Sequence, residues 1–393
     1  MSAELFRRAQ KLFPRGVNSP VRFYEPYPIY IKSGRGSKIK DVDGKEYVDY
    51  VLAYGPLILG HSNPKVVEKV KEKVGEGTIY GAPTEAEVEF GELVKNASGI
   101  DRMRIVNSGT EATMHAIRLA MHATRRKKIL KINGGYHGTH PFNFPSDSVD
   151  TVDFNSSENV RAKLATREFA CLIVEPVMGN IGVIPPEDGF LEEIAQYSED
   201  SGSCLIMDEV ITGFRTGFFP YYRRKKVVPD LVTFGKIVGG GLPLALFGGK
   251  EELMKKVRPE GDFQQAGTYS ANPISVTAGL ETLKILSKTD YGKLKELTGI
   301  AVKELSSTDL TVNFETGMLS IFFSDKPVRN ARDAQNTRKD LYPELFRRAL
   351  QNGIFLPPSF DETIFLSFSH GRDEVAAGFA FLAEEGKRLW KGS

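Results

Sequence analysis

Three short stretches carry side chains whose types and positions could do chemistry. Lys236 follows a strand-like apolar run and leads into three glycines in LVTFGKIVGGGLP (231–243), where its amine could act as a base, form an imine or be a plain surface charge. Asp208 ends the apolar run CLIM, and a carboxylate there is unfavourable unless it meets a cation or several donors. Ser108 and Glu111 in NSGTEA (107–112) have capping-box spacing at a helix start, which can bind phosphate.

In this order, the three stretches indicate pyridoxal phosphate (PLP) chemistry. An aspartate beside a pyridine nitrogen keeps the ring protonated, and a lysine holds the aldehyde and moves protons once it is released. Taken alone, Ser108 is more simply an ordinary helix cap, because capping is so common. The glycines that follow Lys236 let the chain turn sharply and leave one face of the cofactor open.

The elements around these residues predict an α/β fold. Buried strand-like runs at 168–177, 203–210 and 231–236 alternate with helical segments, and a strand, a turn and a helix occupy 102–123. Continuous apolar strands that alternate with helices imply a mostly parallel sheet covered on both faces. Such sheets bind ligands at the carboxyl ends of their strands, where Ser108, Asp208 and Lys236 all lie.

The rest of the chain suggests a second, smaller α+β part. A hairpin is expected around Asp43-Gly44, and a long helix over 274–288 precedes mixed short strands and helices. We predict three segments: residues 1–45 packing with the small domain, 46–275 as the large PLP-binding domain, and 276–393 as the C-terminal small domain.

Composition excludes several classes of protein. A net charge of +2, from 52 basic and 50 acidic residues, argues against a dedicated nucleic-acid or membrane-surface binder, and no secretory signal or membrane span is visible. The only cysteines, Cys171 and Cys204, lie in apolar runs, so we expect core packing rather than a redox pair, and a cytoplasmic protein. His115 and His122 do not form a metal-binding motif, and GGGLP lacks the strand–GxGxxG–helix order of dinucleotide sites, so no metal is predicted.

The motifs NSGTEA, GGYHG, DEVITGFR, TFGKIVGGGLP and GTYSANP resemble those of the fold-type I, class III PLP aminotransferases over nearly the whole chain. The resemblance implies pyridoxal and pyridoxamine phosphate as cofactors and a homodimer with shared active sites. It also implies a role for each matching residue: Lys236 as the Schiff-base lysine, Asp208 at the pyridine nitrogen, Val210 under the ring, Tyr136 stacked above it, Ser108, Gly109 and Thr110 at the phosphate, and Thr268 reaching the phosphate of the other subunit.

Within this family, LFPRGVNSPVR, YGPLILGHSNP, EPVMGNIGVIPP and GIFLPPSFDETIFLSFSH resemble the glutamate-1-semialdehyde 2,1-aminomutase branch. That branch exchanges amines within one substrate and yields 5-aminolevulinate for tetrapyrrole (porphyrin) biosynthesis. The resemblance implies that Ser19 and Arg22 bind the substrate carboxylate, that Glu362 faces the substrate amines, and that Asn180 lies near the cofactor ring. Tyr54 stands where the branch often has tryptophan at the pocket mouth, and it keeps an aromatic wall.

Two alternatives stay open. The branch has a longer, glycine-rich lid after its YHG motif, whereas here a strand-like run returns soon after Gly138, which predicts a short loop. A class III aminotransferase that uses a separate keto acid, of the β-amino-acid or D-phenylglycine type, could keep the cofactor residues without that lid. The other alternative is a non-catalytic binding module of the same fold, against which intact Lys236 and Asp208 argue.

Overall fold

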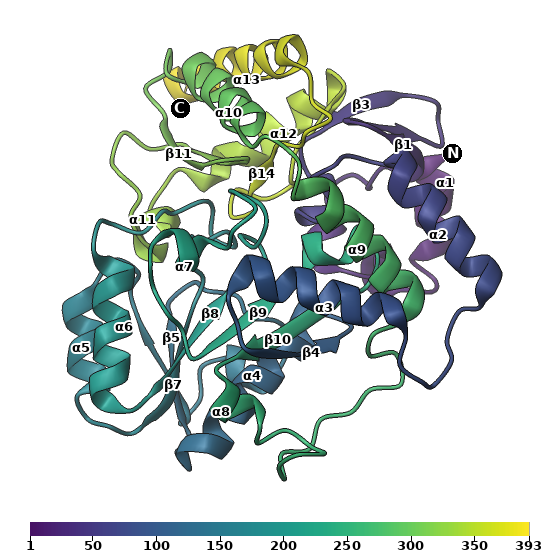
Figure 1. Ribbon diagram of the computed structural model, residues 1–393. Coiled ribbons are helices and arrows are strands. Elements are labelled where there is room, and N and C mark those ends of the chain that lie inside the picture. The colour runs from purple at the N-terminus through teal and green to yellow at the C-terminus, as the bar shows by residue number, and fades with distance from the viewer. Residues whose placement is uncertain (393) are drawn as a thin grey trace.

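The computed structural model describes residues 1–392. A seven-stranded sheet with helices on both faces forms its centre (Figure 1). The strand order is β4-β10-β9-β8-β7-β5-β6, with the bounds β4 (Arg102–Val106), β5 (Lys128–Ile132), β6 (Val149–Val152), β7 (Phe169–Val174), β8 (Cys204–Asp208), β9 (Leu231–Phe234) and β10 (Ala245–Gly249). Strands β6, β5, β7, β8 and β9 are parallel, and only β10 runs antiparallel to its neighbours. The predicted α/β class is confirmed.

Alternate side chains of each central strand pack into two different cores, because successive residues of a strand point to opposite faces of the sheet. In β7, Cys171 and Ile173 pack on the face that carries α4, whereas Leu172 and Val174 pack on the opposite face. Cys171 pairs in register with Cys204 of β8, and both thiols are free and buried. The helices of the large unit are α3 (Glu85–Ser98), α4 (Gly109–Thr124), α5 (Ser157–Leu164), α6 (Phe190–Ser201), α7 (Tyr221–Arg224) and α8 (Glu251–Met254).

Two smaller sheets bring the ends of the chain together. The first has the order β1-β2-β3-β13, with β1 (Ile31–Arg35), β2 (Lys38–Asp41), β3 (Glu46–Asp49) and β13 (Ile354–Phe355). The hairpin predicted at Asp43-Gly44 joins β2 to β3 and is confirmed. The second sheet has the order β11-β12-β14, with β11 (Thr311–Glu315), β12 (Met318–Phe322) and β14 (Ile364–Phe365).

The remaining helices cover these sheets or link them to the large one. They are α1 (Ser2–Ala9), α2 (Pro64–Glu76), α9 (Pro273–Leu286), α10 (Gly292–Leu305), α11 (Ala331–Gln335), α12 (Tyr342–Gln351) and α13 (Arg372–Lys391). Figure 1 shows α10 and α13 lying side by side above the large unit, at the opposite end from α8. No helix within residues 1–392 is long and apolar enough to cross a membrane. The division of the chain after residues 45 and 275 stays a prediction.

Helix α9 supports the turn that carries Lys236. The turn is the short 3-10 helix η5 (Lys236–Gly239), and α9 crosses it at Gly279, where an added Cβ would lie 2.0 Å from the Val238 carbonyl oxygen. A glycine is therefore required for the two backbones to approach each other.

We expect Gly279→Ala to lower the free energy of unfolding by about 1–3 kcal/mol, because the added methyl group forces α9 away from the lysine turn. The matched control is Gly299→Ala in α10, where no atom lies within 4 Å of an added Cβ. Alanine there should stabilise the helix by about 0.5–1 kcal/mol. Thermal unfolding of both variants measures the difference. Equal effects of the two substitutions would contradict the close contact.

Candidate active site

Lys236 lies two residues after the end of β9, in a backbone conformation that few residues adopt. Its φ angle is +49°, in the left-handed region, and its side chain is partly buried. Burial lowers the pKa of the amine, while the negative charges of Glu362 and Glu175 oppose that shift. Desolvation thus favours the neutral amine, the form that attacks carbonyl carbon and accepts protons.

Asp208 ends β8, and its carboxylate is held from two sides. One oxygen, Oδ1, accepts hydrogen bonds from the Thr233 hydroxyl at 2.8 Å and from the Val210 amide at 3.1 Å. The other, Oδ2, lies 2.7 Å from His137 Nδ1. His137 is buried and its Nε2 has no hydrogen-bond partner within residues 1–392. His137, in the GGYHG motif, therefore orients the Asp208 carboxylate.

The predicted helix cap is confirmed at Ser108. Its hydroxyl accepts from the Glu111 amide at 3.2 Å, and the Glu111 carboxylate reaches back to the Asn107 amide at 3.0 Å. Gly109 follows the cap and faces Val210, and an added Cβ there would lie 3.1 Å from Val210 Cγ1. The first turn of α4 therefore presents free amides and small residues, a suitable site for a phosphate group.

These side chains surround one cavity of about 200 Å³, with an aspartate, a lysine and a helix N-terminus around it. A flat aromatic cation that bears a phosphate and an aldehyde matches this set of donors and acceptors, so PLP fits. Eight of the nine predicted cofactor residues line the cavity: Ser108, Gly109, Thr110, Tyr136, Asn180, Asp208, Val210 and Lys236.

Thr268 is the ninth, and it does not line the cavity within this chain. It is exposed, in the long loop that joins α8 to α9 and extends from the lower edge of the molecule in Figure 1. The same loop passes the start of α4, since an added Cβ on Gly267 would lie 3.9 Å from Asn107 Nδ2.

Glu175 is a site residue that sequence reasoning missed. It follows β7, is buried, and accepts hydrogen bonds from the amides of Tyr136 and Gly179 at 3.1 Å each and from Asn180 Nδ2 at 2.9 Å. Burial raises the pKa of this carboxyl group. The signal was present in the sequence, because an acidic residue after an apolar strand is the pattern that singled out Asp208.

Lys131, in β5, was also missed, and it orders the loop that carries Tyr136 and His137. Its amine donates to the Gly135 carbonyl at 2.8 Å and to Asn143 Oδ1 at 2.9 Å, and the same Asn143 oxygen accepts from the His137 amide at 3.0 Å. Burial lowers the pKa of Lys131 to about 8. This buried amine therefore ties both ends of the short loop to the sheet.

Glu362 interacts electrostatically with both Lys236 and Tyr54, although neither Glu362 nor Tyr54 lines the cavity that contains Lys236. Burial raises the pKa of Glu362 to about 7, and the positive charge of Lys236 opposes that shift. The Tyr54 hydroxyl donates to the Val21 carbonyl at 2.5 Å, and its pKa is raised by burial and by the charge of Glu362. Tyr54 therefore stands between the lysine site and the N-terminal segment.

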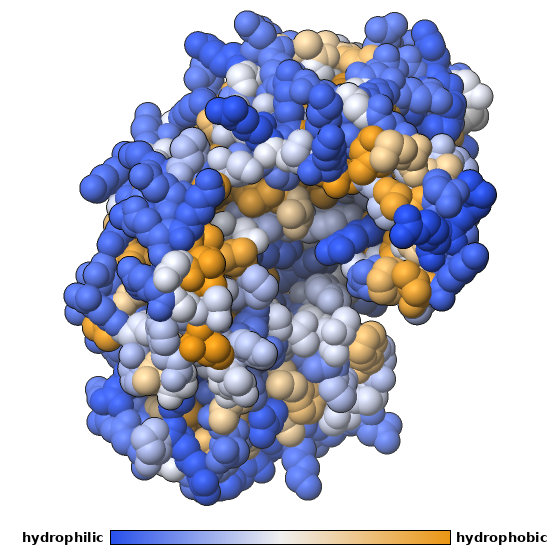
Figure 2. All heavy atoms as spheres, turned by 90° about the vertical axis from the view of Figure 1, so that its right-hand side faces the viewer, coloured by the Kyte–Doolittle hydropathy of each residue, from blue (hydrophilic) through white to orange (hydrophobic). Residues whose placement is uncertain are grey.

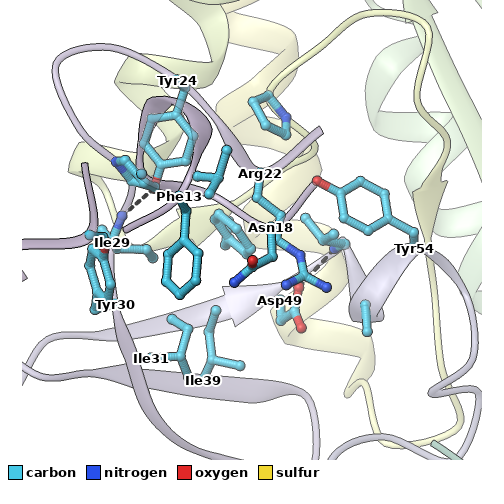
Figure 3. A pocket seen from close by; sticks show the side chains of 18 of the residues that line it. Phe13, Asn18, Arg22, Tyr24, Ile29, Tyr30, Ile31, Ile39, Asp49 and Tyr54 are labelled. Atoms are coloured by element: carbon cyan, nitrogen blue, oxygen red, sulfur yellow. Dashed lines mark hydrogen bonds between the residues drawn. The ribbon is translucent and has the colours of Figure 1, made fainter. Parts of the chain in front are cut away.

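A second cavity, of about 440 Å³, adjoins Tyr54 beneath the N-terminal segment. Figure 3 shows the Arg22 guanidinium directed into it beside Asn18, with Asp49 and Tyr54 nearby. Arg22 is exposed, and Ser19 lines neither cavity. The structure thus places Glu362 and Tyr54 near Lys236 but does not bring Ser19 and Arg22 to the amine. Both lie at the 3-10 turn η2 (Pro20–Arg22), which pairs with no strand.

Comparison with known proteins identifies the family. The family description Aminotransferase class-III matches residues 21–145 and 145–367, most of the chain. The chain belongs to the class III aminotransferases. Among curated relatives, a glutamate-1-semialdehyde 2,1-aminomutase of Thermoplasma volcanium is 44% identical over 409 residues, covering 96% of this chain and 97% of its own.

Solved structures agree with this class III assignment. A transaminase with PLP bound superposes with a TM-score of 0.90 at 27% identity, covering 100% of this chain and 98% of its own. A β-phenylalanine aminotransferase of Variovorax paradoxus gives a TM-score of 0.91 at 25% identity, covering 98% and 93%. Class III aminotransferases use PLP, the group that the cavity beside Lys236 fits.

We expect Gly138→Ala to weaken PLP binding. Gly138 has a φ of +98°, and an added Cβ would lie 2.6 Å from Thr110 Cα, so the loop would have to leave the phosphate end of the cavity. A displacement that costs about 1.4 kcal/mol lowers affinity roughly tenfold. Titration of the apoenzyme with PLP, followed by absorbance, measures the affinity.

The control is Gly44→Ala, which has a matching φ of +95° but no atom within 4 Å of an added Cβ. It introduces the same backbone strain far from the cavity, so its PLP affinity should stay at the wild-type value. If both variants lost affinity equally, the effect would come from general destabilisation and not from the loop.

Proposed function

We propose that this chain is a glutamate-1-semialdehyde 2,1-aminomutase, which moves an amine within one substrate to give 5-aminolevulinate, a tetrapyrrole precursor. The observation that carries the proposal is the 44% identity to an enzyme of that name over 96% of the chain and 97% of the relative. The geometry supports it, since Lys236, Asp208 and the start of α4 line one cavity.

When bound, PLP carries the amine and withdraws electrons from the carbon that bears it. The chain supplies the rest. The Asp208 carboxylate, oriented by His137 and Thr233, keeps a ring nitrogen protonated. The Lys236 amine holds the aldehyde and transfers protons at the reacting carbons, a task for which its lowered pKa suits it. Glu362 has a pKa of about 7, so it can accept a hydrogen bond from a substrate amine or donate one.

On the substrate side, we propose that Ser19 and Arg22 bind the carboxylate, with Tyr54 forming the wall between them and Lys236. Arg22 and Tyr54 share the larger cavity, and the charge of Arg22 opposes the rise in the pKa of Tyr54 that burial causes. A guanidinium is a suitable carboxylate partner because of its fork of donors.

The loop after Gly138 is the main departure from the branch. Ten residues, 139–148, separate Gly138 from β6, and their regular structure is the 3-10 turn η4 (Pro141–Asn143) and an isolated bridge from Ser146 to Val149. An aminomutase must keep its half-converted diamine until the second transfer. A short loop favours the second candidate function, an aminotransferase that passes the amine to an external keto acid.

We also propose that the enzyme is a homodimer located in the cytoplasm. In a dimer, a second copy would supply Thr268 to the phosphate end of the cavity, which Thr268 does not reach within its own chain. Tyr269, next in the loop, is 61% exposed, and Tyr80 in the loop after α2 is 46% exposed. Figure 2 shows a deep recess with hydrophobic residues along its rim, on the side of the molecule where α2 lies.

We expect that pure protein given glutamate-1-semialdehyde, with no other amine, forms 5-aminolevulinate over many turnovers. Lys236→Ala should lose the visible absorbance of bound PLP and lower turnover by roughly 10²–10⁴-fold or more. An assay of 5-aminolevulinate measures both enzymes. If product stopped after one equivalent and resumed when a keto acid was added, the external-acceptor aminotransferase would be the correct function.

Subunit exchange tests whether the two copies share the active site. Lys236→Ala and Thr268→Asp enzymes should each be inactive, the latter because a carboxylate repels the phosphate. Mixed, unfolded and refolded together, they should regain up to roughly a quarter of wild-type activity, since half the dimers are mixed and each has one intact site. Each variant refolded alone is the control. No recovery in the mixture would place Thr268 in its own chain's site, and an active Thr268→Asp enzyme refolded alone would place Thr268 outside any site.

A further inference from the structure

Arg215 is a fully buried cation without a counter-ion. Its side chain has no exposed surface, and no carboxylate in residues 1–392 lies within ion-pair distance. Its guanidinium donates to the Gly55 carbonyl and, at 3.3 Å, to the Leu366 carbonyl, and it lies 4.6 Å from the centre of the Phe365 ring. Nε has no partner. A buried charge paired only with carbonyls is costly, so its presence calls for a reason other than stability.

The segment that Arg215 holds is strained. Leu52, Ala53 and Tyr54 have φ angles of +46°, +56° and +64°, and Gly55 follows at +115°. Three successive non-glycine residues in the left-handed region are rare, because each Cβ approaches the following carbonyl. Such a turn persists only when its surroundings hold it. Asp49 does so at one end, where Oδ1 accepts from the amides of Val51 and Leu52.

Arg215 contacts the other end of this turn, at Gly55, which lies next to Lys236. Gly55 lies between the guanidinium and the Lys236 side chain, since a Cβ added to Gly55 would be 3.4 Å from Lys236 Cδ and 3.3 Å from Phe365 Cζ. Three separate segments therefore meet here: the turn at 52–55, the lysine turn after β9, and β14 with the residue that follows it. Arg215 contacts the first and third and supports the second through Gly55.

We propose that Arg215 is a positioning residue of the active site, which locks the strained turn Leu52–Gly55 against Lys236 and places an unneutralised positive charge near the lysine amine. The inference rests on Lys236 holding the cofactor, as proposed above, and not on the identity of the amine acceptor.

The charge has a defined effect on Lys236. The carboxylates that face the amine are Glu362 before β14, Glu175 after β7 and Asp208 at the end of β8, and each raises the pKa of Lys236. Arg215 lowers it, and Tyr291 at the start of α10 is the titratable group that faces Arg215 itself. Removal of the guanidinium leaves burial alone to oppose the effect of these carboxylates on the pKa of Lys236. The pKa of Lys236 then rises, and the neutral amine needed for proton transfer forms only at higher pH.

The test is the pH dependence of Lys236 acetylation in the pyridoxamine form of the holoenzyme, where this amine is free. Brief reaction with acetic anhydride, followed by mass spectrometry of the Lys236 peptide, gives the midpoint at which the amine loses its proton. In Arg215→Met we expect the midpoint to rise by about one pH unit or more, and turnover at neutral pH to fall about tenfold. Because no substrate is present, the midpoint does not depend on which reaction the enzyme catalyses.

Arg215→Lys separates the charge from the fork of donors. It should keep the wild-type midpoint but increase amide hydrogen exchange in residues 52–57, because an ammonium cannot bridge two carbonyls as a planar guanidinium does. If Arg215→Met does not fold, the hydrogen exchange of Arg215→Lys still tests the proposal. The control is Arg126→Met, another arginine that bridges two carbonyls, those of Phe169 and Ser201, and it should leave the midpoint unchanged.

Two results would overturn the proposal. The first is a wild-type midpoint in folded Arg215→Met, which would show that the charge does not act on Lys236. The second is wild-type hydrogen exchange at residues 52–57 in Arg215→Lys, which would show that the guanidinium does not lock the turn.

Discussion

The carboxylate of Asp208 sets the chief constraint on this active site, because it is buried at the end of an apolar strand and must be satisfied there. Thr233 and the Val210 amide occupy one oxygen and His137 the other. Since β8 and β9 are parallel neighbours, the same edge of the sheet brings Lys236 to the cavity that Asp208 lines. In the proposed function, Asp208 would hold the ring nitrogen of the cofactor and Lys236 would hold its aldehyde, because both side chains line this one cavity.

Around this pair, the structure gathers several features that are individually unfavourable. Lys236 and the turn before Gly55 have left-handed backbone, and burial raises the pKa of Glu362. Arg215 is buried, and no carboxylate in the described part of the chain pairs with it. Elsewhere, the two cores on either face of the large sheet are continuous and apolar. The strained and charged groups thus lie at one end of a well-packed scaffold, as expected when local instability serves binding and proton transfer.

The sequence predicted those parts that depend on local pattern. The parallel strands, the cap at Ser108 and the hairpin at Asp43-Gly44 follow from periodicity and turn chemistry, and the structure confirms them. The partner of Asp208 could not be foreseen, because His137 reaches it from a loop 71 residues earlier in the chain. The burial of Arg215 left no signal, since arginine is ordinarily exposed. The separation of Ser19 and Arg22 from Lys236 also depends on how a segment without strand pairing lies on the domain.

The small sheet formed by β1, β2, β3 and β13 has a consequence for how the protein is made. In this sheet β3 and β13 are parallel neighbours, with Val48 opposite Ile354. Nearby, the Lys45 amine donates a hydrogen bond to the carbonyl of Leu350, 305 residues away. At usual rates of synthesis, the N-terminal hairpin emerges roughly 15–60 s before the strand that completes its sheet. During that interval one edge of β3 has no partner, so the growing chain exposes a strand edge that a chaperone, or another nascent copy, could occupy.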